Sequence, residues 1–151
     1  MSERVKGATS VSLMFRLVDS STGLAKSGID VTTLFLQYDR PGEAASTATS
    51  LTLLAALTTA YAAYGAIEIN STRSKGVYRV DIPNGAFGSG ADEVVITISG
   101  TGIEPTTRLV SLTSFDAPNA ATGGLTNLHP AVTTEPTNAR AARRASFRAM
   151  T

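Results

Sequence analysis

The feature that most constrains this chain is a period-two alternation of apolar and polar side chains. It is clearest in SVSLMFRLVD, from Ser10 to Asp19, where one side of the segment carries Val11, Leu13, Phe15 and Leu17. Successive side chains of a strand point to opposite faces, so the pattern predicts a strand with one buried face. A second β-rich segment runs from Val31 to Tyr38 and ends at Pro41 and Gly42, which favour a β-turn.

Similar segments recur along the chain, around Ile67 and over residues 76–83, 93–100 and 106–115, and the links between them contain Gly, Pro or Asn. Roughly six or seven short strands, spaced about ten residues apart, predict a mainly β protein with an immunoglobulin-like β-sandwich. The core candidates are Val11, Leu13, Phe15, Leu17, Leu34, Leu36, Tyr78, Val80, Ile82, Val95, Ile96, Leu109 and Val110.

Two of these candidates, Val95 and Ile96, are neighbours and cannot both point inward on a regular strand. We therefore expect one of the two to lie at the periphery or at an interface.

One segment favours a helix within the β pattern. It is rich in alanine, and its larger side chains recur near helical spacing: Leu53, Leu54, Leu57, Tyr61 and Tyr64. Ser50 or Thr52 can cap its start and Gly65 can end it. The sequence therefore predicts a short inserted helix from about Leu53 to about Ala63.

The chain divides into four parts by composition. We expect an N-terminal extension over residues 1–9, the sandwich over 10–115, a linker arm containing Pro and Gly over 116–136, and a basic segment over 137–151. The last segment is predicted to form a short helix, which would be marginal in water without a partner. Its candidate partner-binding residues are Arg140, Arg143, Arg144, Phe147 and Arg148.

Charge and composition narrow the class of protein. The 151-residue chain has a formal net charge of only +1, and its charged residues make up 17% of the total, which describes a weakly charged surface. It contains no cysteine, so a disulfide or thiolate metal site is excluded. The first residues, MSERVKGATS, hold no apolar run, and we expect a soluble protein made in a cytoplasm.

The residues that could carry catalysis do not form a recognisable constellation. His129 is the single histidine and lies in the linker, where nothing nearby suggests the partners that a triad or a metal site would need. Asp81 with Asp92 or Glu93 is imaginable as a general acid and base pair, but alternation places Asp81 on the solvent face of a strand. We interpret the glycines of the NGAFGSGAD stretch as turn residues: Gly85, Gly88 and Gly90. The sequence predicts a protein that is not an enzyme and uses no cofactor or metal.

Several short motifs resemble a widespread group of uncharacterised bacteriophage and prophage proteins. The first is a tyrosine followed by Arg-Pro-Gly, present here as Tyr38, Arg40, Pro41 and Gly42 with Asp39 interposed. The second is an Ala-rich segment that ends in an aromatic residue and a glycine before a Glu-containing strand, here Tyr64, Gly65 and Glu68. The third is a Gly-x-Tyr-Arg-x-Asp-x-Pro strand leading to Ala-Phe, here Gly76, Tyr78, Arg79, Asp81, Pro83, Ala86 and Phe87. The resemblance covers roughly residues 11–115 and implies a phage origin and a shared fold.

With this resemblance, we expect a non-enzymatic virion structural protein, a capsid decoration or cement module that docks through its C-terminal arm. Its expected partners are other virion proteins, met in many copies in a symmetric assembly, with no small-molecule substrate and no membrane. Its expected location is the virion, after synthesis in the host bacterial cytoplasm.

Three alternatives stay open. A tail, neck or tail-fibre-attachment adaptor fits the same features. The arginines at the end of the chain could instead bind nucleic acid, although the rest of the chain is not basic. A carbohydrate-binding sandwich would need more exposed aromatic residues than this sequence supplies.

Overall fold

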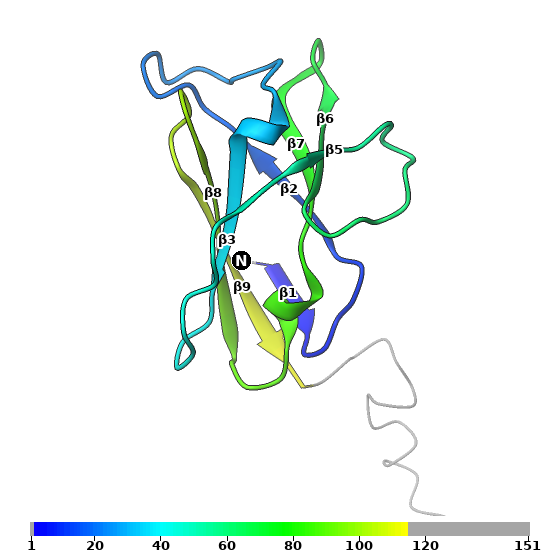
Figure 1. The fold of residues 1–151 in the computed structure, drawn as a ribbon, viewed down its shortest axis with the longest axis vertical. Coiled ribbons are helices and arrows are strands. Elements are labelled where there is room, and N and C mark those ends of the chain that lie inside the picture. The colour runs from blue at the N-terminus through cyan, green and yellow to red at the C-terminus, as the bar shows by residue number, and fades with distance from the viewer. Residues whose placement is uncertain (1, 115–151) are drawn as a thin grey trace, which may run out of the picture. The chain divides into compact units, whose positions relative to one another are not determined.

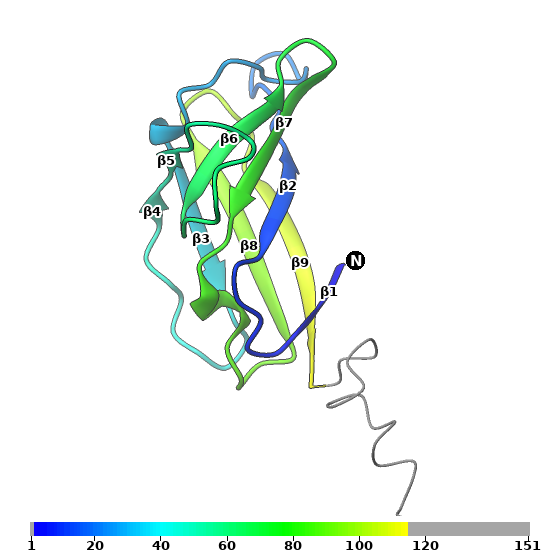
Figure 2. The same cartoon turned by 90° about the vertical axis from the view of Figure 1, so that its right-hand side faces the viewer.

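The computed structural model describes residues 2–114, which form two β-sheets in a sandwich-like arrangement (Figures 1 and 2). Sheet A has the order β1 (Ser2–Val5), β9 (Thr106–Thr113), β8 (Glu93–Gly100), β3 (Leu34–Asp39) and β4 (Thr49–Ser50). Sheet B has the order β2 (Ser12–Arg16), β7 (Ser74–Asp81), β6 (Gly65–Asn70) and β5 (Thr52–Leu53). Two short 3-10 helices, η1 (Val31–Thr33) and η2 (Asn84–Phe87), lie in the connections. The predicted mainly β class is confirmed.

Neighbouring strands pair antiparallel in both sheets, with two exceptions. β5 runs parallel to β6, and β1 runs parallel to β9 with Ser2 opposite Val110 and Val5 opposite Thr113. The hydrogen bond from the Lys6 amide to the Thr113 carbonyl, 2.8 Å long, continues this pairing. Residues of the predicted N-terminal extension therefore form an edge strand of sheet A.

The alternation in β2 places its side chains as the sequence predicts. Leu13 and Phe15 are buried, whereas Met14 and Arg16 are exposed. All the predicted core residues are buried except Val95 and Leu109, which are half-buried on the outer side of sheet A. The expectation for the neighbouring pair is confirmed, because Ile96 is buried and Val95 is peripheral. The core also includes buried residues beyond the predicted ones: Val31, Leu51, Leu54, Ala66, Ala86, Phe87, Ala91, Val94, Ile98, Ile103 and Leu112.

The predicted helix from Leu53 to Ala63 is wrong. This stretch begins as β5 and continues as an irregular loop, residues 54–64, which we call the β5–β6 loop. Its backbone groups bond outside the segment: the Leu54 amide donates to the Ala66 carbonyl and the Ala62 amide donates to an Asp81 carboxylate oxygen. A helix would have needed the Ala62 amide for its own bonds, so tertiary partners override the high helix propensity of alanine and leucine.

The predicted linker arm and basic helix, 116–136 and 137–151, lie outside the described residues. Within residues 2–114, the structure has no helix of the length and hydrophobicity needed to span a membrane.

Candidate functional site

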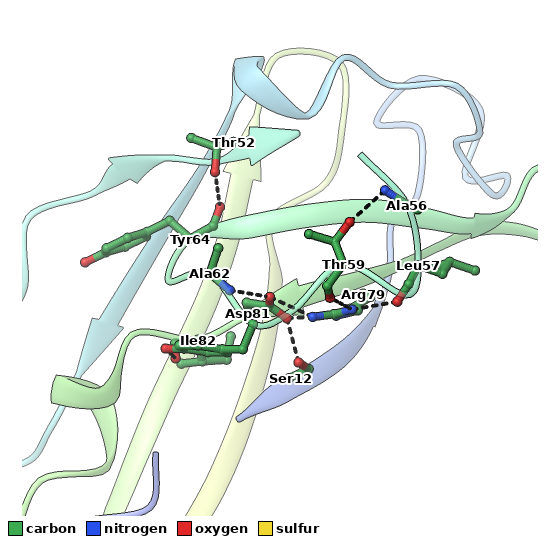
Figure 3. A network of polar contacts seen from close by, with 11 residues as sticks. Ser12, Thr52, Ala56, Leu57, Thr59, Ala62, Tyr64, Arg79, Asp81 and Ile82 are labelled. Carbon is green, nitrogen blue, oxygen red and sulfur yellow. Dashed lines mark hydrogen bonds and ion pairs between the residues drawn. The ribbon is translucent and has the colours of Figure 1, made fainter. Parts of the chain in front are cut away.

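The most distinctive polar cluster of the described residues lies on the side of sheet B that faces away from sheet A (Figure 3). Arg79 and Asp81 are two residues apart on β7, so both side chains are on the same side of the strand. Arg79 Nε lies 2.9 Å from Asp81 Oδ1 and Nη2 lies 2.9 Å from Oδ2, a bidentate pair. Asp81 is fully buried.

Two further donors complete the surroundings of Asp81. The Ser12 hydroxyl of β2 donates to Oδ1 over 2.5 Å, and the Ala62 amide of the β5–β6 loop donates to Oδ2 over 3.0 Å. Burial alone would raise the pKa of Asp81, but the hydrogen bonds from Arg79, Ser12 and Ala62 outweigh burial and hold that pKa below its ordinary value. The carboxylate is therefore charged at neutral pH and fully paired, which makes it a structural group.

The same pair fixes the β5–β6 loop. Arg79 Nη1 donates to the carbonyls of Leu57 and Thr59, over 2.7 and 3.0 Å. The Tyr61 hydroxyl donates to the Ile82 carbonyl over 2.7 Å. The loop, which projects to the right of β6 and β7 in Figure 1, is therefore held at several points along its length.

The loop closes at Tyr64, whose φ of 66° lies in the left-handed region. A non-glycine residue costs about 1–2 kcal/mol there. Two backbone bonds hold the residue in place: its amide donates to the Asp81 carbonyl, and its carbonyl accepts from the Thr52 amide, each over 2.9 Å. The β5–β6 loop is thus fixed at its end as well as along its length.

The surface that this loop presents is uncharged. No charged residue occurs between Glu43 and Glu68 in the sequence. Leu53 and Leu57 are exposed, as are the alanines at positions 55, 56, 60, 62 and 63. A fixed apolar loop of this kind can dock against another protein, because little conformational freedom remains to be lost on binding.

Asp81 does not lie on the solvent face of its strand, as the alternation predicted. Its side chain does point to the outer side of sheet B, but the β5–β6 loop covers it there and excludes water. The other member of the imagined acid pair, Asp92, binds Lys6 over 2.6 Å instead. Each of these two carboxylates thus has its own basic partner.

The first motif of the phage resemblance lies against the NGAFGSGAD stretch, residues 84–92, which contains the end of the third motif. The Arg40 guanidinium binds Glu43 and packs against Gly88, and the Tyr38 hydroxyl packs against Gly85. A side chain on either glycine would displace the end of the Arg40 or Tyr38 side chain. Glycine at these two positions leaves room for the ends of the Arg40 and Tyr38 side chains.

The sequence-predicted partner-binding residues, Arg140, Arg143, Arg144, Phe147 and Arg148, lie outside the described residues, as does His129. Among residues 2–114, no group of three His, Cys, Asp or Glu side chains is placed to hold a metal ion. No protein family model, curated protein or solved structure matches this chain.

Proposed function

We propose that the protein is a non-enzymatic structural component of a bacteriophage particle, a module that decorates or cements the capsid. The motif resemblance supports the phage origin. The observation that carries the docking role is the β5–β6 loop, an uncharged surface held by a buried ion pair.

The proposed fold is immunoglobulin-like, and the strand order supports it. In that architecture the fourth and fifth strands, D and E, lie beside B in one sheet, and C, F and G form the other. With β2, β3, β6, β7, β8 and β9 taken as B to G, sheet B contains B-E-D and sheet A contains G-F-C. β1 differs from the constant-domain pattern because it pairs with β9 instead of β2. Sandwiches of this kind serve as rigid scaffolds whose loops contact partners.

The polar chemistry of the candidate site supports a structural role. Both carboxylate oxygens of Asp81 accept hydrogen bonds from donors of the same chain, and the Arg79 guanidinium donates to Asp81 and to two loop carbonyls. A general acid or base must instead reach a proton on a substrate. The geometry supports docking better than it supports catalysis.

Exposed leucines give a direct test. We expect Leu57→Asp to reduce the amount of this protein on purified particles by about tenfold or more, since a charge would be buried in the contact. Leu24→Asp is the matched control, because Leu24 is exposed to 69% in the β2–β3 loop and Leu57 to 42%. The measurement is quantitative mass spectrometry of particles from the phage that encodes the chain, made with each variant in place of the native protein.

Labelled antibodies on the same particles locate the protein. Labelling of the head supports capsid decoration, and labelling of the tail or neck would replace decoration by the adaptor role. Absence of the native protein from purified particles would overturn the virion assignment. Equal incorporation of Leu57→Asp and the native chain would remove the β5–β6 loop from the docking surface.

A further inference from the structure

The two outer sides of the sandwich carry charges of opposite sign. On the strands of sheet A, register and burial place Glu3, Asp39 and Glu93 on the outer side. Glu3 and Glu93 lie on either side of Ser111, and Asp39 lies opposite Val95. The two cations of these strands are on the inner side: Arg4 lies opposite the buried Leu112, and Arg108 lies opposite the buried Ile96. The outer face of sheet A is therefore acidic.

The outer face of sheet B has the opposite charge. Arg16 is exposed between the buried Phe15 and Leu17, and Lys75 is exposed near the start of β7. Asp81 is the one carboxylate that the described strands place on this face, and it is neutralised by Arg79. Glu68 lies opposite the buried Tyr78, on the inner side.

Glu68 is also occupied within the sandwich. It accepts hydrogen bonds from the amides of Gly28 and Gly76, each over 2.9 Å. It is thus not available to offset Arg16 and Lys75 on the outer face of sheet B.

Both outer faces also expose apolar surface. On sheet A, Phe35 is exposed to 43%, and Val95 and Leu109 lie opposite each other and are half-buried. On sheet B, Met14 is exposed to 48%, and Val77 is half-buried opposite Arg16. Apolar side chains bordered by charge are typical of protein interfaces.

We propose that the outer face of sheet A in one copy of the protein packs against the outer face of sheet B in a second copy. Sheets pack face to face at about 10 Å, and their half-buried side chains then exclude water from one another. The acids Asp39 and Glu93 meet Arg16 and Lys75 of the neighbour. This contact uses two different surfaces, so repetition of it forms a closed ring or an open filament.

Charge decides against the two symmetric alternatives. Contact of sheet A with sheet A would set Glu3, Asp39 and Glu93 against their own copies, and contact of sheet B with sheet B would do the same for Arg16 and Lys75. Like charges placed opposite one another disfavour a contact, whereas opposite charges guide it.

The position of the charges restricts the arrangement further. Asp39 ends β3 and Glu93 begins β8, at one end of sheet A. Arg16 ends β2 at the opposite end of that strand from Ser12, and the β5–β6 loop covers the face of sheet B near Asp81. The open part of sheet B is therefore its Arg16 end. The acidic end of one copy reaches it when the copies are staggered along the strands or turned end for end.

The test uses charge reversal on the full-length chain. The acid-face variant carries Asp39→Lys and Glu93→Lys, and the base-face variant carries Arg16→Glu and Lys75→Glu. We expect the native chain to self-associate in sedimentation velocity at about 0.05 M salt and each variant alone to be monomeric. Glu104→Lys, at an exposed position of the β8–β9 turn, is the control and should associate like the native chain.

Two recombinations test whether opposite charges hold the copies together. An equimolar mixture of the acid-face and base-face variants should associate although neither variant does so alone, because the native acidic face of one variant meets the native basic face of the other. A chain with all four reversals should regain self-association, because its faces are again complementary. A monomeric native chain at about 1 mM, a mixture that stays monomeric, or loss of association in the fourfold variant would overturn the proposal.

The chain's own arginine-rich terminus is the competing occupant of the acidic face. Protection of that terminus from trypsin in monomeric native protein, with loss of protection in the acid-face variant, would assign the face to it and overturn the second-copy contact. The inference deepens the structural role proposed above. Its test uses the purified chain alone, so failure of self-association and absence from particles are separate results.

Discussion

The β5–β6 loop and the β2–β3 loop, residues 17–30, are both irregular segments held by a carboxylate, but they obtain it from different places. The β2–β3 loop supplies one of its own, Asp19, which binds Lys26 and accepts from the amides of Ser21 and Thr22, over 2.9 and 3.0 Å, and Glu68 of β6 accepts from the amide of its Gly28. The β5–β6 loop has no charged residue, and its anchor is Asp81 on β7. A loop that must present an apolar surface can thus be fixed by a strand beneath it.

The two anchors also differ in their contact with water. The Asp19 side chain keeps 17% of its surface exposed and Lys26 keeps 39%, whereas Asp81 keeps none. A solvated pair is screened and contributes little, but removal of one member of a buried pair leaves an uncompensated charge. The comparison therefore predicts large effects at Asp81 and small ones at Asp19.

The largest expected effect is that of Asp81→Ala. Loss of the carboxylate leaves the Arg79 guanidinium nearly buried without its partner and frees the Ala62 amide, so we expect a loss of about 3–5 kcal/mol in the free energy of unfolding. Urea denaturation followed by circular dichroism measures it. A loss below about 1 kcal/mol would show that the buried pair does not anchor this part of the fold.

Ser12→Ala should have an intermediate effect. The Ser12 hydroxyl donates to a charged oxygen, and its loss should cost about 1–2 kcal/mol in the same measurement. Ser12→Thr keeps the donor and is the control.

Ser12→Ala should also change the pH dependence of stability. The lowered pKa of Asp81 means that its contribution to stability is complete above the unfolded value of about 3.9 and is lost as pH falls through the folded pKa. Ser12→Ala raises the folded pKa, so the acid-unfolding midpoint should move to higher pH. A midpoint that stays in place would mean that Ser12 does not stabilise the charged form.

The smallest effect is expected for Asp19→Asn. The Lys26 hydrogen bond and the amides of Ser21 and Thr22 lower the pKa of Asp19 to about 2. Its stabilisation is therefore present above about pH 4 and is lost between about pH 4 and about pH 2. Native protein and Asp19→Asn should differ slightly at neutral pH and converge across this window. A large difference at pH 7 would break the contrast with Asp81.

The strands were the more predictable part of the molecule. In β2 the side chains alternate between the core and solvent, so the alternation of apolar and polar residues predicts the buried face directly. Leu51 and Leu54 were harder to place, because both are buried although they flank a two-residue strand at a sheet edge. Such positions follow from the packing of the two sheets, and alternation within one segment does not reveal them.

The candidate site could be predicted only in part. The spacing of Arg79 and Asp81 places both on one side of a strand, which is compatible with an ion pair. Burial of the pair depends on the β5–β6 loop. Thr59 of this loop accepts a hydrogen bond from Arg79 Nη1 although it lies twenty residues earlier in the sequence. Local helix propensity pointed to the wrong structure there, because the partners that override it belong to another strand.

The parallel pairing of β1 with β9 has a mechanical consequence. Ser2 begins β1, Ser114 follows the end of β9, and the two strands run the same way. Opposite pulls on Ser2 and Ser114, each directed outward along its own strand, therefore slide β1 past β9. The evenly spaced bonds of a parallel ladder are then loaded together instead of opening one after another. Tension along this path is resisted by the whole length of β1, and the rate of forced unfolding depends on shearing that strand from β9.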